Sequence, residues 1–158
     1  MPMKHRGKSD PPEEAVTAWV RLVRAEQTVL GCIEAELKSG GLPPLSWYDV
    51  LLELERSQDG RLRPMELERR TLLAQYNASR LIDRMEAAGM VTREAHPEDK
   101  RGQLIAITPE GRALRKKIWR IYGPAIAHHV GCKLQRDEAT TLAALLEKLI
   151  DQPKSGDA

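Results

Sequence analysis

The sequence is short of aromatic residues and of long apolar runs. Among its 158 residues there is no Phe, and three Trp and three Tyr make up the whole aromatic set. Leu, Ile, Val, Ala and Met must therefore fill the interior. No apolar run approaches the ~18 residues that a membrane span requires, and the N-terminal stretch MPMKHRGKSDPPEE lacks the apolar core of a signal peptide. We expect one domain, or one domain with an oligomerisation arm, in the cytoplasm and not in a membrane.

Motifs for catalysis and metal binding are also missing. The sequence contains no glycine-rich phosphate loop, no nucleophile elbow and no metal-ligand spacing. Adjacent histidines such as His128 and His129 point to different faces of a helix, so one chain can hardly bind one metal with both. We therefore expect no enzyme, no cofactor and no metal.

The net charge of +2 does not identify a partner, but the basic residues are unevenly spread. A cluster of this kind without a motif is usually a solvated surface. Here a motif coincides with the first of two clusters, in which acidic residues are interleaved. The first cluster contains Arg61, Arg63, Arg69, Arg70, Arg80, Arg84, Arg93, Lys100 and Arg101, and the second contains Arg112, Arg115, Lys116, Lys117 and Arg120.

Residues 61–108 have the pattern of two helices joined by a tight turn and followed by a hairpin. In the second helix Ala78, Leu81, Ile82 and Met85 recur at the spacing of one buried face. Gly89 is suited to end that helix. Residues 90–92 and 103–108 then resemble two short strands, with the polar tip EAHPEDKRG between them. This order predicts a winged helix-turn-helix within a mainly α fold with a small β-wing.

The rest of the second helix is polar, which favours nucleic acid over protein as its partner. Amide, hydroxyl and guanidinium groups reach base edges and phosphates when a helix lies in a major groove. A winged module that binds only protein, which is the alternative, should be apolar on this face. The predicted DNA-binding residues of the helix are Gln75, Tyr76, Asn77, Ser79, Arg80 and Arg84.

Other helix boundaries follow from caps and breakers. Residues 13–37 form a long helix with a wide apolar stripe, and prolines and glycines break the chain before Ser46. Ser46 resembles an N-cap, with Asp49 three residues on in a capping-box arrangement. Residues 108–110, Thr-Pro-Glu, are a strong helix start. Pro124 should kink that helix or end its first segment.

The first helix and the last helices leave more apolar surface than one small domain can cover. A two-fold dimer would cover it and would present two recognition helices to successive major grooves, about 34 Å apart, on a roughly palindromic site. The predicted division is a tail at 1–12, an N-terminal dimerisation helix at 13–45, a winged DNA-binding domain at 46–108, C-terminal dimerisation helices at 109–150 and a tail at 151–158.

From residue 19 to residue 150 the chain resembles the MarR family of bacterial transcriptional regulators. The resemblance is carried by LSWYDVLLEL (residues 45–54), RPMELERRTLLAQYNASRLIDRMEAAGMVTRE (63–94) and EDKRGQLIAITPEG (98–111). The chain departs from the family at Ile107, where Leu is usual, and at residues 74–76, where a Ser cap is frequent.

This resemblance implies a homodimer, usually a repressor, that binds double-stranded DNA and loses affinity when a ligand or an oxidant acts. Gln75, Tyr76, Asn77, Ser79 and Arg80 would enter the major groove. The wing residues Asp99, Lys100 and Arg101 would bind DNA as well, with Arg101 in the minor groove and Asp99 orienting it by a charge-assisted bond.

Two kinds of control are compatible with the sequence. In this family effector pockets lie between the dimerisation helices and the winged domain, and a pocket there would suit a small aromatic or phenolic anion. The aromatic residues available are Trp19, Trp47, Tyr48, Trp119 and Tyr122, each of which could equally be core. The second kind is oxidation of Cys32 or Cys132, although Cys32 on the apolar side of its helix packs more simply as a small hydrophobe.

Overall fold

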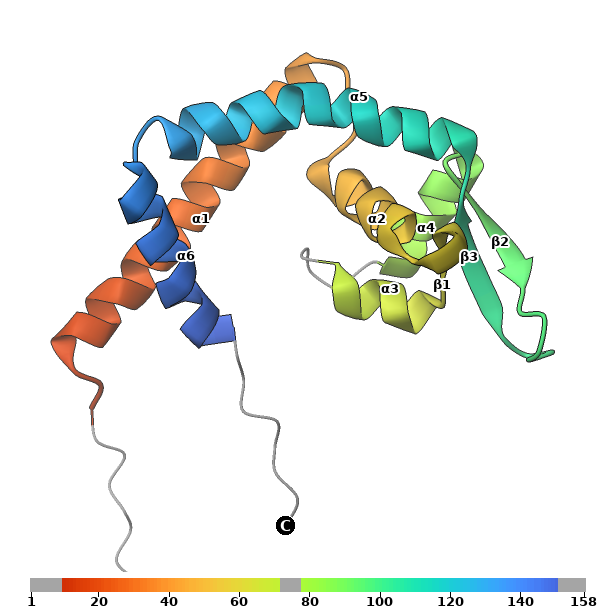
Figure 1. The fold of residues 1–158 in the computed structure, drawn as a ribbon, viewed down its shortest axis with the longest axis horizontal. Coiled ribbons are helices and arrows are strands. Elements are labelled where there is room, and N and C mark those ends of the chain that lie inside the picture. Colours follow the sequence, from red (N-terminus) through yellow and green to blue (C-terminus); the bar gives the residue numbers. More distant parts are fainter. Residues whose placement is uncertain (1–9, 72–77, 151–158) are drawn as a thin grey trace, which may run out of the picture.

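A computed structural model describes residues 10–71 and 78–150 of the chain. A winged domain and a helical arm are connected by the long helix α5, which runs along one edge of the molecule (Figure 1). The elements are α1 (Glu13–Ser39), α2 (Leu45–Arg56), η1 (Gln58–Gly60), β1 (Arg61–Leu62), α3 (Pro64–Arg70), α4 (Ala78–Ala87), β2 (Val91–Ala95), β3 (Gln103–Ile107), α5 (Pro109–Ile126), the π-helix η3 (Ala127–Gly131) and α6 (Arg136–Ile150).

The winged domain is built from α2, α3 and α4 against a three-stranded antiparallel sheet of order β1-β3-β2. Leu62 is paired with Ile105, and Val91 with Ile107. The buried face of α4 comes from Ile82 and Met85, as the helical spacing predicts. The core of this domain consists of Val50, Leu51, Leu54, Leu62, Leu67, Ile82, Met85, Val91 and Ile105. The predicted mainly α fold with a small β-wing is confirmed.

A second core lies where α1, α2 and α5 meet. Ile33 and Leu37 of α1 pack there with Tyr48 of α2 and Ile118 of α5. Leu114 of α5 contacts both cores, so one helix belongs to the winged domain and to the arm at once.

The start of α5 and the end of α4 are joined by one side chain. The Thr108 hydroxyl accepts a hydrogen bond from the Gly111 N–H at 3.0 Å, which is the predicted N-cap, and donates to the Gly89 carbonyl at 2.6 Å. Gly89 has a φ of +78°, a left-handed conformation that ends α4 and strongly favours glycine. Both predicted boundaries are confirmed.

The predicted N-cap at Ser46 is wrong. Helix α2 begins at Leu45, two residues earlier than predicted, and Pro44 in the cap position supplies no side-chain hydrogen bond. The Leu45 N–H donates instead to Glu34 Oε1 at 3.0 Å, from α1. A carboxylate from a neighbouring helix therefore does the work that a local hydroxyl was expected to do, and Asp49 is buried in α2 instead of completing a capping box.

Pro124 does not end α5. The α-helix continues to Ile126 and then widens into the π-helix η3. Because proline has no N–H to donate, the helix loses one ladder bond here, and the irregular turn follows just after it.

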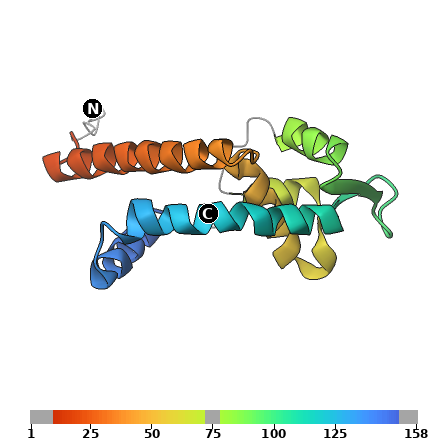
Figure 2. The ribbon, with the colours of Figure 1, turned by 90° about the horizontal axis from the view of Figure 1, so that it is seen from above.

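The arm leaves apolar side chains uncovered in a single chain. None of the residues of α6, all of which the structure describes, is buried. Figure 2 shows α6 beside the end of α5 and apart from α1. The exposed large apolar residues of the arm are Val16, Trp19 and Val20 on α1 and Leu142, Leu145, Leu149 and Ile150 on α6. No helix in residues 10–71 and 78–150 combines the length and apolar character needed to cross a membrane.

Candidate nucleic-acid interface

The exposed face of α4 carries part of the predicted DNA-reading set. Ser79, Arg80 and Arg84 are exposed. Arg80 and Arg84 lie on the side of the helix away from Ile82 and Met85, whereas Ser79 lies beside Ile82 at the edge of the buried face. The other three predicted residues, Gln75, Tyr76 and Asn77, lie outside the residues that the structure describes.

Arg93 on β2 ties the wing to α4. Its Nη2 donates to Asp83 Oδ1 at 2.6 Å and its Nη1 to Glu86 Oε1 at 3.2 Å, while its backbone N–H donates to Glu86 Oε2 at 3.1 Å. The hydrogen bond with Asp83, together with the negative charges of Asp83 and Glu86, raises the pKa of Arg93. Three bonds from one residue therefore fix the angle between the recognition helix and the wing.

The wing tip places Lys100 and Arg101 in solvent, beside a carboxylate that organises the loop. Asp99 Oδ1 accepts a hydrogen bond from the Arg101 backbone N–H at 3.1 Å, and Asp99 Oδ2 accepts one from Arg63 Nη1 at 3.4 Å. These bonds lower the pKa of Asp99, with the Arg101 amide as the larger cause. Asp99 thus orients Arg101 through its backbone, and the ion pair of Asp99 is with Arg63.

The two basic clusters divide into paired and unpaired side chains. In the first cluster Arg61 pairs with Glu94 at 2.8 Å, and Arg63 and Arg93 are engaged as described. In the second cluster Arg112 and Arg115 both pair with Glu55. Within the described part of the chain no ion pair involves Arg80, Arg84, Lys100 or Arg101. These cations on α4 and at the wing tip are therefore free of ion pairs to described residues and can neutralise an incoming phosphate, and the same holds for Arg69 and Arg70 on α3.

A pocket lies between α2 and α5, where three aromatic rings meet. Tyr48 stacks on Trp119 with ring centroids 5.9 Å apart, and Tyr122 meets both rings edge-on at 5.1 and 5.7 Å. These rings line a pocket of about 240 Å³ with Arg56 at its border. Burial, followed by the neighbouring Tyr48 and Asp49, raises the pKa of Tyr122.

The structure brings together three of the five aromatic residues predicted for a pocket. Tyr48, Trp119 and Tyr122 share it. Trp47 instead packs against the core of the winged domain, and Trp19 is 65% exposed on α1. The pocket therefore offers aromatic walls to a ring, with the guanidinium group of Arg56 and the buried carboxylate of Asp49 as its charged neighbours.

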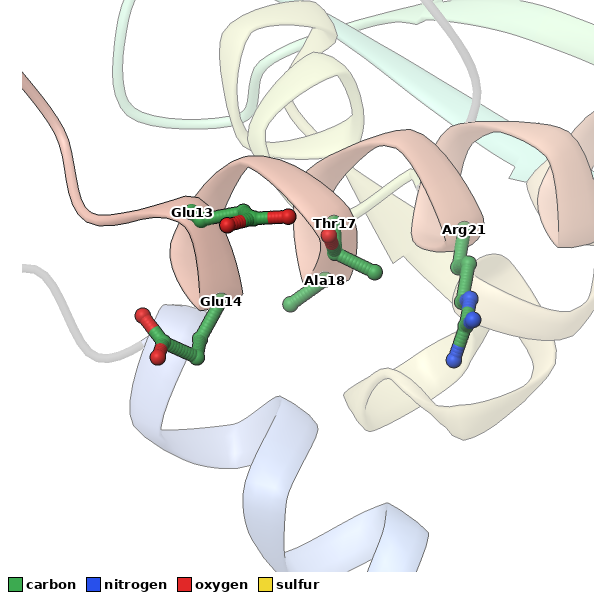
Figure 3. A pocket seen from close by; sticks show the side chains of 5 residues that line it. All are labelled: Glu13, Glu14, Thr17, Ala18 and Arg21. Atoms are coloured by element: carbon green, nitrogen blue, oxygen red, sulfur yellow. The ribbon is translucent and has the colours of Figure 1, made fainter.

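The arm helix α1 has two unlike faces in its exposed half. A hollow of about 460 Å³ lies along one face, lined by Glu13, Glu14, Thr17, Ala18 and Arg21 (Figure 3). Glu14, Ala18 and Arg21 project to the side on which α6 lies. The opposite face carries the apolar Val16, Trp19 and Val20. The face of α1 that needs covering is thus turned away from the chain's own α6.

The cysteines and histidines occupy separate places. Cys32 is half-buried on α1 and Cys132 is exposed after η3. His129 Nε2 lies 2.5 Å from Glu36 Oε1 and so links η3 to α1. Among the described residues no group of three or more His, Cys, Asp or Glu side chains has the arrangement of a metal site.

Comparison with known proteins agrees with the helix order and with the wing. A family model described as "MarR family" matches residues 40–102, from just before α2 through the wing tip. The multiple antibiotic resistance protein MarR of Salmonella typhimurium is 31% identical over 91 residues, which are 58% of this chain and 63% of that protein. The winged part of the chain is similar to proteins of the MarR family. The matched part spans just under two thirds of that curated MarR relative.

Solved MarR-family structures extend the likeness to the arm. Sco3205 from Streptomyces coelicolor, solved in complex with DNA, superposes with a TM-score of 0.83 at 24% identity over 94% of this chain and 95% of that one. A mutant of MarR from E. coli, solved with operator DNA, has a TM-score of 0.75 at 25% identity over 89% and 99% of the two chains. The fold of the whole described chain is therefore a MarR-family fold.

The sequence placed Arg93 in a basic cluster but did not reveal its role, which is to hold α4 on the wing in this MarR-family fold. A signal was present, because Asp83 and Glu86 lie three residues apart on one helix face and Arg93 follows four residues after Gly89, within the next strand. It also did not separate the arginines that form ion pairs from those that remain available, since that division depends on which elements become neighbours.

Proposed function

We propose that this chain is a DNA-binding transcriptional regulator that acts as a repressor. The observation that carries the proposal is the division of its basic residues. Arg61, Arg63 and Arg93 are held in ion pairs within the winged domain, whereas the exposed Arg80 and Arg101 are not. The division leaves cations on the two elements that enter DNA grooves in winged helices, the recognition helix and the wing.

Each residue has a stated role in this proposal. Ser79 and Arg80 read base edges in the major groove together with Gln75, Tyr76 and Asn77, whereas Arg84 contacts phosphate. Arg101 enters the minor groove, and Lys100 neutralises a neighbouring phosphate. DNA bound to Sco3205 and to MarR from E. coli supports this assignment, which is made for the present chain on its own residues.

The active form is a homodimer on a pseudo-palindromic operator in the bacterial cytoplasm. The exposed apolar residues of α1 and α6 support this, because the apolar face of α1 is turned away from the chain's own α6. A second copy that covers these faces would place two recognition helices about 34 Å apart.

Control is exerted by a small aromatic anion in the pocket of Tyr48, Trp119 and Tyr122. The pocket lies between α2 of the winged domain and α5, which continues into the arm. A ligand that binds better to the conformer with wrongly spaced recognition helices weakens operator binding by that difference in affinity.

The experiment that tests the proposal is a binding titration of the purified chain against DNA flanking its own gene, with salt and competitor DNA varied. Tight, sequence-selective binding with a steep salt dependence is the expected result. Weak binding that is equal on all sequences would contradict it and would favour a winged module with a protein partner.

A further inference from the structure

The tip of the wing, residues 96–102, is a closed loop held by its own backbone. The His96 N–H donates to the Gly102 carbonyl at 3.0 Å, and the Gly102 N–H donates to the Asp99 carbonyl at 2.9 Å. The loop is tight, since a Cβ on Gly102 would lie 3.0 Å from Asp99 Oδ2 and 3.2 Å from the Cβ of His96. The conformation of this loop determines where Arg101 is presented.

His96 caps the loop from inside through one ring nitrogen. Its Nδ1 accepts hydrogen bonds from the backbone N–H groups of Glu98 and Asp99, both at 3.1 Å. An imidazole nitrogen accepts only when it carries no proton, so these two donors require the neutral ring with its proton on Nε2.

The cap is linked to Arg101 through Asp99. The Asp99 N–H is held by His96, and the Asp99 carboxylate in turn accepts from the Arg101 N–H at 3.1 Å. We propose that His96 is a positioning residue for Arg101, and that its neutral imidazole is required for the wing to engage the operator, so that specific DNA binding weakens as the pH falls. This inference rests on the proposed function.

Protonation of His96 removes the cap for a geometric reason. A protonated Nδ1 can no longer accept a hydrogen bond, so both bonds from the backbone N–H groups are lost. The three N–H groups would then point their hydrogens at one another, which is unfavourable.

Charged groups around the ring would also respond to its protonation. The Asp99 carboxylate would attract the imidazolium and leave the Arg101 amide and the guanidinium of Arg63, while Glu98, Lys100 and Arg101 are exposed on the same loop.

The added charge itself has the opposite effect on unspecific binding. An imidazolium near phosphates strengthens attraction to any DNA sequence. Loss of the cap lowers only the affinity that depends on a correctly placed Arg101. The ratio of operator affinity to scrambled-DNA affinity therefore isolates the cap.

The test is a fluorescence-anisotropy titration of the full chain between pH 8.0 and 5.5, with an operator duplex and with a scrambled duplex of the same length. The matched variant is His96→Asn, because an amide oxygen in this position accepts from the same two N–H groups and does not titrate. For the wild type we expect the affinity ratio to fall by at least roughly fivefold over this range, which is the lower limit for the loss of two hydrogen bonds. For His96→Asn we expect a flat ratio. Parallel pH profiles for the two proteins would overturn the proposal.

A second measurement, made without DNA, tests whether His96 caps the loop. In ¹⁵N NMR spectra at pH 8.0 we expect the Nε2–H tautomer of His96, and we expect the amide signals of Glu98 and Asp99 to move with its titration. An Nδ1–H tautomer, or amides that ignore the titration, would overturn the proposal. If the wild type binds no operator even at pH 8.0, the proposed function fails, and these spectra alone decide whether His96 holds the loop.

Discussion

The guanidinium group of Arg93 on β2 lies 2.6 Å from the carboxylate of Asp83 on α4, and its second bond reaches Glu86 one helical turn later. The two elements to which we assign different grooves of DNA are thus held together by one side chain that is only a quarter exposed. The turn at Gly89 lies between these acids and Arg93 in the sequence. The contact therefore joins the recognition helix to the wing strand on the two sides of that turn.

Replacing Arg93 with Gln should weaken both the fold and operator binding. Loss of its charge-assisted bonds should lower the free energy of unfolding by about 1–2 kcal/mol. Operator affinity should fall more than stability alone explains, because α4 and the wing lose their fixed angle. Urea denaturation and anisotropy titration measure the two effects. Arg61→Gln is the matched control, since its ion pair with Glu94 joins β1 to β2 and leaves α4 untouched. Equal losses in the two variants would contradict the role given to Arg93.

Removing the wing cation in Arg101→Ala should reduce operator affinity by roughly tenfold and lower the salt slope by about one. The side chain is exposed and has no ion pair to any described residue, so the oligomeric state should stay unchanged. Arg120→Ala serves as the control, because it removes the same charge from an exposed position on α5. An operator affinity that is unchanged in Arg101→Ala would refute its place in the minor groove.

The pocket should prefer an anionic ring to a neutral one. Its volume of about 240 Å³ is larger than the ~150 Å³ cavity that admits benzene. We expect benzoate to bind more tightly than phenol, and Arg56→Gln to remove roughly threefold of that preference, a modest factor because Arg56 is mostly exposed. Isothermal titration calorimetry gives both affinities. An unchanged preference for benzoate in Arg56→Gln would show that another group recognises the carboxylate.

Placing a charge in the apolar seam of α6 should separate the proposed dimer. Leu145 is 52% exposed in the single chain, so Leu145→Asp should cost the monomer little stability while it prevents burial against a second copy. Ala144→Asp adds the same charge on the side of α6 away from this seam and should remain dimeric. Analytical ultracentrifugation distinguishes the two. A wild-type chain that sediments as a monomer would exclude the dimer altogether.

The elements that sequence reasoning placed correctly are those specified locally. Thr108 caps α5 through a residue three positions away, and Gly89 ends α4 through its own backbone angle. Both signals lie within one helical turn and need no knowledge of the rest of the fold.

The features that sequence reasoning missed depend on contacts between distant residues. The α2 N-terminus is capped by Glu34, eleven positions away in the chain, so the nearby Ser46 was the wrong choice. Trp47 and Tyr48 are neighbours in sequence, yet one packs on the winged domain and the other lines the aromatic pocket. Helical geometry predicts that adjacent residues diverge, but which core each one reaches depends on how α5 is packed.

The position of α5 has a mechanical consequence. Its first turn is joined through Thr108 to the end of the recognition helix, and its later turns are packed into the arm with α1. Its 18 residues form a stiff rod about 27 Å long at 1.5 Å per residue. A tilt of only about 5° at the arm would therefore displace the DNA-reading end by roughly 2 Å. That displacement is more than half of a hydrogen-bond length. A small ligand-induced rotation near Tyr122 would therefore suffice to move a recognition helix away from its bases.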